Sequence, residues 1–204
     1  MHKNLLLIFT RNPELGKVKT RLAKTVGPKT ALEIYTFLLE KTRLEASTVN
    51  ADKAVYYSVK IRENDCWDAT IFEKHQQKGN DLGERMQNAF EKGFKDGYKN
   101  IIIIGSDLYD LSSKAIDAAF SDLDTHDAVI GPAEDGGYYL LGLKKLHTSV
   151  FRDKEWGTSS VEKETLNNLK AYHIKRLEIK NDIDVYEDIT SIPEIMNRFI
   201  LDKN

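Results

Sequence analysis

Two short runs of consecutive apolar residues constrain the fold more than any other feature of this sequence. They are LLLIF at residues 5–9 and IIII at residues 101–104. A strand that is apolar at every position has to be covered on both faces, and such strands are typical of the centre of a parallel sheet. We therefore expect a central sheet with helices on both sides.

Helical and extended segments alternate along the chain. Further strand-like segments lie at 52–59, 70–75 and 172–179. Apolar residues recur at helical spacing, one stripe to a helix, in 29–46, 81–96 and 112–123. This alternation predicts an α/β fold.

One turn-rich segment interrupts this alternation. It is PAEDGG, residues 132–137, and it separates strand-like runs at 128–131 and 138–143. Two strands joined by such a turn predict a hairpin or crossover added to the sheet. The expected architecture is a three-layer αβα sandwich around a mostly parallel, mixed sheet.

Composition excludes several classes of protein. The 204 residues include 30 basic and 32 acidic side chains, and a nucleic-acid binder would carry a positive excess. No apolar run approaches the length of a membrane helix and no signal-peptide pattern is present, so we expect a cytoplasmic protein with no membrane span. The single cysteine, Cys66, excludes an intrachain disulfide. We expect residues 1–204 to form one domain.

A basic loop follows the first strand. Its charged side chains and one glycine are Arg11, Gly16, Lys17, Lys19 and Arg21. Where a strand passes into a helix, free N–H groups and the positive end of the helix dipole attract phosphates, and glycine allows close backbone approach. The loop therefore predicts a phosphate site, with a solvated basic loop as the alternative. It lacks both G-x-x-x-x-G-K-S/T and G-x-G-x-x-G, which excludes a P-loop kinase and a dinucleotide fingerprint.

Two acidic segments are candidates for a metal site. Asp107 follows the strand at 100–105, and magnesium needs few protein carboxylates when substrate phosphates complete its shell. A turn capped by Asp107 and Asp110 fits the sequence equally well. Asp182 and Asp184 share one side if their segment is extended, whereas capping of the next helix by Asp184 is the alternative.

Three glycine-containing segments remain. In GPAEDGG, a hairpin turn explains the glycines but not the acids, so Asp135 is predicted to contact a substrate. In the segment from Gln76 to Met86, a capping box explains the acids but not Gly79, Gly83 or Arg85. The tryptophan of WGTSS, residues 156–160, is typical of a core position.

These segments together resemble a known family. GKVKTRLA, Q-x-x-G-N-D-L-G-E-R-M, IIGSD and GPAEDGGYYLLGL, followed by WGTSS and DID, occur in the family's order between residues 16 and 184. The family is an uncharacterised bacterial set of glycosyltransferase-A-like proteins, associated with radical-SAM and selenoprotein-type domains. The resemblance implies the nucleotide-diphospho-sugar transferase fold, shared with molybdenum-cofactor guanylyltransferases and sugar-phosphate nucleotidyltransferases.

The resemblance also implies roles for individual residues. Gly16, Lys17 and Arg21 would contact phosphates, and the segment from Gln76 to Gly83 would contact the nucleotide base. Asp107 would hold Mg²⁺ or Mn²⁺, with Asp184 as a second ligand. One departure is Tyr109, because the family's G-S-D-x-P-x-L has proline there, and the fixed φ of proline is lost.

The sequence thus predicts a magnesium-dependent glycosyltransferase-like enzyme that uses a nucleotide-sugar donor and an unknown acceptor. Asp107 and Asp135 are the candidate catalytic residues, with Asp135 activating the acceptor. One alternative is a nucleotidyltransferase that releases pyrophosphate from a nucleoside triphosphate. A second, which the Tyr109 departure keeps open, is a nucleotide-binding protein without catalysis.

Overall fold

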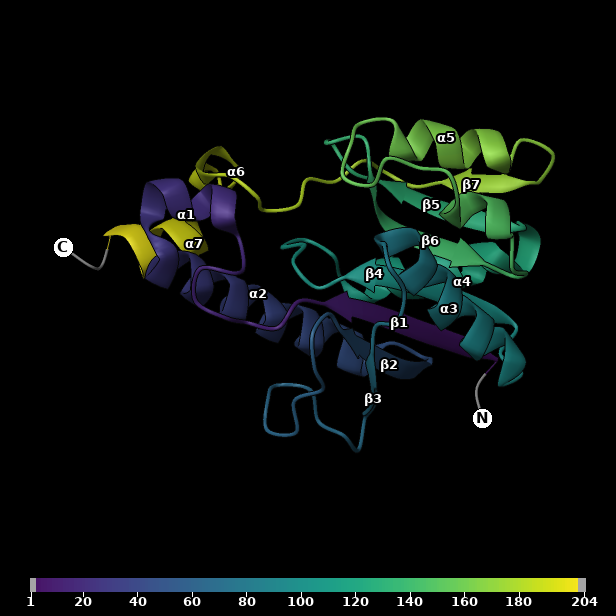
Figure 1. Cartoon of the computed structure of the whole chain (residues 1–204), viewed down its shortest axis with the longest axis horizontal. Helices are drawn as coiled ribbons and strands as arrows, with labels where there is room; N and C mark the ends of the chain where they lie inside the picture. The colour runs from purple at the N-terminus through teal and green to yellow at the C-terminus, as the bar shows by residue number, and fades with distance from the viewer. Residues whose placement is uncertain (1–2, 202–204) are drawn as a thin grey trace.

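The computed structural model describes residues 3–201 and contains one seven-stranded mixed sheet (Figure 1). The strand order is β3-β2-β1-β4-β6-β5-β7. The bounds of the strands are β1 Asn4–Thr10, β2 Asp52–Tyr57, β3 Phe72–Gln76, β4 Asn100–Gly105, β5 Ala128–Pro132, β6 Tyr138–Leu143 and β7 Ile174–Arg176.

Only β6 runs against its neighbours. Strands β3, β2, β1 and β4 are parallel, β6 pairs antiparallel with both β4 and β5, and β5 pairs parallel with β7. The predicted hairpin of β5 and β6 is therefore confirmed, and the sheet is mixed as expected.

Helices cover both faces of the sheet. Their bounds are α1 Thr20–Val26, α2 Pro28–Thr48, α3 Leu82–Lys95, α4 Ser113–Thr125, α5 Val161–Asn168, α6 Tyr186–Thr190 and α7 Pro193–Met196, with short helical turns η1 Thr148–Phe151 and η2 Asn197–Leu201. The three helices predicted from sequence correspond to α2, α3 and α4. Helix α1 was not predicted, and Gly27 (φ +81°) with Pro28 separates it from α2.

The central strands show why both faces are covered. Leu6 and Ile8 of β1 pack under α2 and α4, whereas Leu5 and Leu7 pack under α3 and η1. Each of these four side chains is at most 5 % exposed. Burial of each leucine or isoleucine contributes about 1.5–3 kcal/mol, so the consecutive apolar run holds both layers together. The predicted three-layer αβα sandwich is confirmed.

A small helical cluster packs at one end of α2. It is formed by α1, α6, α7, η2 and the start of α2, which Figure 1 shows apart from the sheet, and its core includes Leu22, Ile34 and Ile189. Tyr109 joins this cluster to the loop after β4. Its hydroxyl donates to Glu194 Oε2 (2.7 Å), and Lys41 Nζ lies 4.5 Å from the centre of its ring. The tyrosine that replaces proline thus has a packing role.

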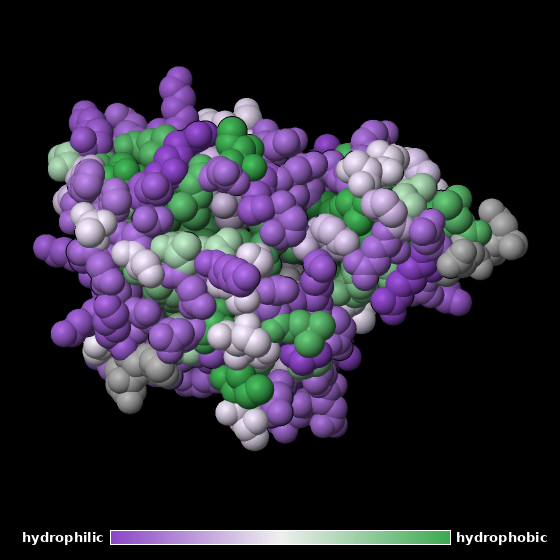
Figure 2. Space-filling view, turned by 180° about the vertical axis from the view of Figure 1, so that it is seen from behind, coloured by the Kyte–Doolittle hydropathy of each residue, from purple (hydrophilic) through white to green (hydrophobic). Residues whose placement is uncertain are grey.

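The face of the molecule opposite to that of Figure 1 is mostly hydrophilic. Figure 2 shows apolar side chains in separate groups on the face opposite to that of Figure 1. Among residues 3–201, no helix has the length and apolar character needed to cross a membrane.

Two glycines of α3 give a matched test of the packing. A Cβ on Gly83 would lie 2.1 Å from the backbone oxygen of Phe151, whereas one on Gly93 would meet only the ends of the Ile101 and Leu5 side chains. Backbone cannot yield as flexible side chains do, so we expect Gly83→Ala to destabilise the protein by about 1–3 kcal/mol and Gly93→Ala by less. Urea unfolding measures both. Equal losses would contradict close packing of α3 on η1.

Candidate active site

Two adjoining cavities open at the carboxyl ends of β1 and β4, the edge where ligands bind in open α/β sheets. They share Phe9, Leu82 and Asp107. The first, here the basic cavity, has a volume of about 740 Å³ and is lined by Phe9, Thr10, Arg11, Asn12, Glu14, Lys17, Tyr35, Ser58, Val59, Gln77, Leu82, Arg85, Ser106 and Asp107.

The second cavity, here the acidic cavity, has a volume of about 250 Å³. Its lining is formed by Phe9, Leu82, Met86, Ile103, Ile104, Gly105, Asp107, Leu108, Ala133, Asp135, Gly137, Tyr138, Tyr139, Trp156, Gly157, Thr158, Val161 and Asp182. Together the two cavities form one cleft with Asp107 at its middle.

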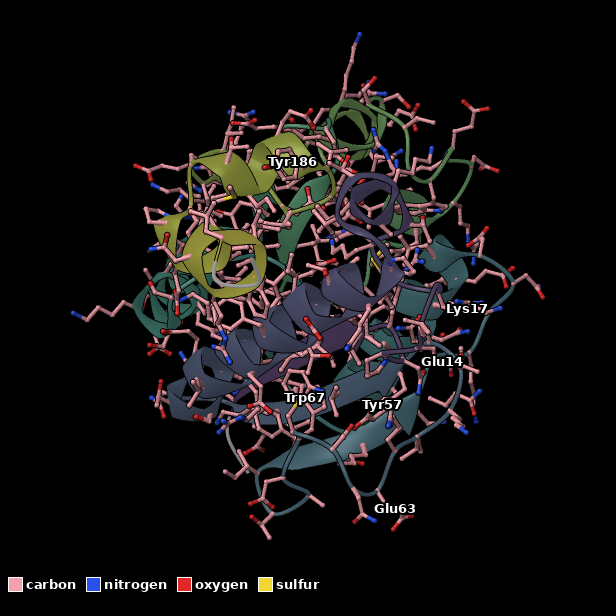
Figure 3. All side chains as sticks on the ribbon, turned by 90° about the vertical axis from the view of Figure 1, so that its left-hand side faces the viewer. Glu14, Lys17, Tyr57, Glu63, Trp67 and Tyr186 are labelled. Carbon is pink, nitrogen blue, oxygen red and sulfur yellow. The ribbon has the colours of Figure 1, made fainter. Side chains whose placement is uncertain are left out.

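The basic loop between β1 and α1 borders the basic cavity. Gly16 adopts a left-handed conformation (φ +72°) within a turn in which Lys17 N donates to Glu14 O at 3.0 Å. Figure 3 shows Glu14 and Lys17 close together at this edge of the molecule. Both line the cavity, and Val18 anchors the loop in the core. The loop is therefore held in place although most of its side chains are exposed.

Lys19 forms a buried ion pair with Asp107. Its Nζ lies 2.7 Å from Asp107 Oδ2, and its side chain is only 6 % exposed. Burial acts to lower the pKa of Lys19, but the carboxylates of Asp107, Asp182 and Asp184 outweigh burial, and the pKa is raised above 10.5. Lys19 is therefore a fixed positive charge beneath the cleft, and its ammonium is already paired.

A buried polar network joins the ends of β1 and β4. The Tyr35 hydroxyl accepts from Arg11 N (3.0 Å) and donates to Arg11 O (3.1 Å), while Ser106 Oγ donates to Thr10 Oγ1 (3.1 Å). Thr42 Oγ1 donates to Ser106 O (3.1 Å). These bonds fix the backbone at the end of β1 and at Ser106, directly before Asp107.

Asp182 reaches the acidic cavity from the carboxyl-terminal part of the chain. The segment leading to it runs beside β5, where Lys180 N donates to Pro132 O (3.1 Å) and Glu134 N donates to Lys180 O (3.1 Å). Burial and the nearby charges of Asp107 and Asp135 raise the pKa of Asp182 above 3.8, although Lys19 opposes this shift. Three carboxylates therefore face one small space.

Asp184, the predicted second metal ligand, lies elsewhere. Its Oδ2 accepts a hydrogen bond from Arg21 Nη1 at 2.7 Å. This ion pair occupies Arg21, a side chain that the sequence predicted to bind phosphate. The backbone N–H groups of Asp184 and Val185 donate to Asp188 Oδ2 and turn the chain into α6. Because this segment leaves the sheet, Asp182 and Asp184 do not share a side. Asp182 rather than Asp184 accompanies Asp107.

Asp135 lies at the tip of the predicted hairpin. Its Oδ1 accepts from Gly137 N (2.8 Å), and the carboxylate lines the acidic cavity. Gly136 (φ +85°) is needed for close packing, since a Cβ there would lie 2.4 Å from Ser159 O. Packing and turn geometry therefore explain the glycines, and the Asp135 carboxylate remains available to a ligand.

The segment after β3 is only partly in the cleft. Arg85 lines the basic cavity and its Nε donates to Gly79 O (3.1 Å). Gln76 lies outside the cleft lining, and its amide donates to Val59 O, whereas Gln77 lines the cavity and donates to Thr10 O and Tyr56 O. Gln77 follows the last residue of β3, so strand alternation in the sequence does not show which of the two glutamines faces the cavity.

The two glycines of this segment are also outside the cleft lining. Gly79 (φ +140°) forms the close turn before α3, and Gly83 packs against Trp156 and the backbone of Phe151. Trp156, for which sequence indicated a core position, is half-buried and lines the acidic cavity with Tyr138 and Met86. These apolar wall residues were missed because periodicity predicts burial but not which buried side chains border a cavity.

The carboxylates fit a divalent cation only in part. Within residues 3–201, no group of three or more His, Cys, Asp or Glu side chains is arranged to hold a metal ion. However, Asp107 and Asp182 are hard oxygen donors that face one cavity, and burial, together with the charges of Asp107 and Asp135, raises the pKa of Asp182. Such a pair fits Mg²⁺ or Mn²⁺ if water and substrate phosphates supply the other ligands.

Residues 43–158 match a family described as an uncharacterized protein conserved in bacteria, DUF2064. This chain belongs to that family. The resemblance predicted from the ordered motifs is thereby confirmed. No curated protein matches the sequence.

Solved structures share the fold. A Desulfovibrio desulfuricans protein, described as a candidate nucleotide-diphospho-sugar transferase, is 30 % identical with a TM-score of 0.86, covering 98 % of this chain and 92 % of that one. A 4-diphosphocytidyl-2C-methyl-D-erythritol synthase from Anaerococcus prevotii is 12 % identical, with a TM-score of 0.57 and coverage of 96 % and 97 %. Rv0371C of Mycobacterium tuberculosis, crystallised with manganese, is 10 % identical, with a TM-score of 0.56 and coverage of 94 % and 98 %.

Crowding of the three carboxylates has a measurable consequence. Replacing Asp182 with asparagine removes its repulsion with Asp107 and Asp135, so we expect Asp182→Asn to raise the melting temperature of the ligand-free protein by roughly 2 °C at about pH 7. The raised pKa means that protonation removes the same charge as the pH falls, so the gain should shrink towards about pH 4.

Thermal unfolding followed by circular dichroism at both pH values measures this effect. Glu91→Gln, an exposed change on α3, serves as the control and should leave the melting temperature unchanged. An unchanged or lower melting temperature for Asp182→Asn at neutral pH would contradict the repulsion.

Proposed function

We propose that this protein is a metal-dependent glycosyltransferase that uses a nucleoside diphosphate sugar as donor. The observation that carries this proposal is the division of one cleft into a basic and an acidic cavity that meet at Asp107. A donor with anionic phosphates at one end and a sugar at the other matches this division. The Desulfovibrio relative, at 30 % identity, supports a reaction of the same kind.

The basic cavity suits the nucleoside diphosphate. Arg11, Lys17 and Arg85 line it, against the carboxylates of Glu14 and Asp107. Lys17 and Arg11 belong to the loop at the end of β1, and charge-assisted hydrogen bonds from such side chains hold phosphate oxygens strongly. Exposed apolar side chains, Val59 and Leu82, also line the cavity and offer contacts to a nucleobase.

Asp107 and Asp182 would hold the metal ion together with donor phosphates. When bound, a divalent cation would stabilise the negative charge of the departing nucleoside diphosphate. Lys19 orients the Asp107 carboxylate through its 2.7 Å ion pair. Neutralisation of the leaving group is therefore shared between Lys17 above the cleft and the charges around Asp107.

Asp135 is the candidate base in this reaction. A bond forms between the acceptor oxygen and the anomeric carbon of the sugar, and the bond from that carbon to the diphosphate oxygen breaks. The electron pair leaves with the nucleoside diphosphate, and the acceptor proton passes to the Asp135 carboxylate, which Gly137 N holds at 2.8 Å. The acceptor would approach from the open side of the hairpin tip.

Nucleotidyl transfer is the second candidate. It is favoured by the three cationic side chains of the basic cavity, which exceed what a diphosphate requires, and by the shared fold of cytidylyltransferases. In that reaction the acceptor attacks the α-phosphorus of a nucleoside triphosphate and pyrophosphate leaves. Incubation with Mg²⁺ and a panel of donors separates the two, because one yields a nucleoside diphosphate and the other pyrophosphate.

Asp107 should be required in either case. We expect Asp107→Asn to abolish the magnesium-dependent part of the thermal stabilisation by nucleotide, because an amide lacks the charge that a hard cation needs. Thermal shift with nucleotide, with and without Mg²⁺, measures this, and product formation should fall at least about a hundredfold. A full magnesium-dependent shift in the variant, with Glu91→Gln as control, would reject the metal proposal.

Lys17 should be required for nucleotide binding. We expect Lys17→Ala to weaken nucleotide affinity by more than about tenfold, since a hydrogen bond to a charged group contributes about 1.5–3 kcal/mol. Lys29→Ala, an exposed lysine of α2 outside both cavity linings, is the matched control. Calorimetry measures both affinities. Unchanged affinity in Lys17→Ala would favour a solvated loop.

A further inference from the structure

We propose that the acidic cavity binds an uncharged, hydroxyl-bearing ring of monosaccharide size and rejects rings that carry a phosphate besides the donor phosphates held at Asp107. The inference rests on the proposed function and names the chemistry of the substrate part that reaches beyond Asp107. It applies to the sugar of the donor in glycosyl transfer and to the acceptor in nucleotidyl transfer.

Charge is the first argument. Asp107, Asp135 and Asp182 line the cavity, and its described lining contains no lysine, arginine or histidine. The cation beneath it, Lys19, is paired with Asp107 at 2.7 Å. Even with a divalent cation bound, that cation and Lys19 would only balance the three carboxylates. The donor phosphates would meet that cation from the basic cavity, so a further phosphate dianion inside the acidic cavity would find repulsion without a compensating donor.

The nearby helix start does not supply a phosphate site. Helix α5 begins beside the cavity at Val161, but Glu162 N already donates to Gly136 O at 2.9 Å. Its first turn also carries the carboxylates of Glu162 and Glu164. Their negative charges offset the attraction that the positive end of the helix dipole would exert on an anion. The described lining of the acidic cavity therefore offers phosphate neither a cationic side chain nor a free helix start, whereas Arg11 and Lys17 line the basic cavity.

The apolar walls are the second argument. Trp156 lines the cavity and lies edge-on to Tyr138, with ring centres 6.5 Å apart and planes at 87°. Gly83 allows α3 to pack directly on the indole, because a Cβ there would lie 2.7 Å from its Nε1. A tryptophan fixed from two sides is a rigid surface for the C–H face of a ring.

The carboxylates then serve as acceptors for hydroxyl groups. Asp135 has one described protein hydrogen bond, from Gly137 N to Oδ1, and this bond fixes the carboxylate while Oδ2 remains an acceptor. Asp182 lines the same cavity from the segment that follows β7. An apolar wall with a few placed acceptors is the usual composition of a small-molecule site, and about 250 Å³ suits one ring.

The test compares sugars that differ only in phosphate. The full-length protein is saturated with a nucleoside diphosphate and Mg²⁺, and saturation-transfer NMR measures binding of glucose, galactose, mannose and N-acetylglucosamine against glucose 1-phosphate, glucose 6-phosphate and glucosamine. We expect at least one neutral sugar to bind at least about tenfold more tightly than both phosphates, and no more weakly than the amine. Tighter binding of a phosphate or of glucosamine, or no binding of any sugar, would overturn the proposal.

Variants assign the effect to the cavity. Trp156→Ala should lower neutral-sugar affinity at least about tenfold, Trp156→Phe should retain most of it, and Tyr172→Ala, an exposed aromatic outside the cavity lining, should change nothing. Asp135→Lys should reverse the preference towards the phosphates. If Trp156→Ala does not fold, Asp135→Lys decides alone, and an unreversed preference would reject the assignment.

Failure of this inference differs from failure of the proposed function. Nucleotide binding is measured first, without sugar, and reports on the basic cavity. If nucleotide binds and sugar phosphates are preferred, only the acidic-cavity inference fails. If nucleotide does not bind, the proposed function fails, and the sugar comparison in its absence still decides the chemistry of the acidic cavity.

Discussion

The pairing of β1 with β4 is the constraint on which the site depends. Both strands are apolar at consecutive positions, and they lie side by side in parallel register from Leu5 and Ile101 onwards. Burial on two faces places them at the centre of the sheet, and parallel direction makes their following loops emerge at one edge. The basic loop after one strand and Asp107 after the other therefore meet without any direct sequence relation between them.

Ion pairs then determine how the loop after β1 packs against the end of β4. The 2.7 Å pair between Lys19 and Asp107 is shielded from solvent on the lysine side, whereas the Arg21 to Asp184 pair is largely exposed. An exposed pair contributes little to stability, but a buried charge without its partner is costly. Lys19 thus links the loop to the strand end, and Tyr109 makes a second link to the helical cluster. The cleft lies between elements that several contacts hold together.

The two cavities explain how one cleft can bind a molecule that has an anionic end and an uncharged end. Cationic side chains gather on the side of β1, and carboxylates with aromatic walls gather on the side of β6 and the hairpin tip. Burial and the neighbouring carboxylates raise the pKa of Asp182, and shifted pKa values of this kind are common at functional sites. The apolar wall of the acidic cavity is formed by Trp156 and Tyr138, and Gly83 packs against the indole. The carboxylates are the charged groups in this lining.

The sequence by itself determined the layered α/β fold, the order of the strands and of helices α2, α3 and α4 along the chain, the hairpin, and the positions of Asp107 and Asp135 after strand ends. These follow from local patterns, since apolar periodicity and turn residues act over a few neighbours. It could not distinguish Asp182 from Asp184 or Gln76 from Gln77, and it did not reveal Trp156 as a cavity wall. Those choices depend on contacts between segments far apart in the chain: Arg21 engages Asp184, Asp188 turns the backbone into α6, and α3 packs on the indole through Gly83. Only the tertiary structure decided them, because a side chain's direction at the end of a strand is set by the partners that folding brings to it.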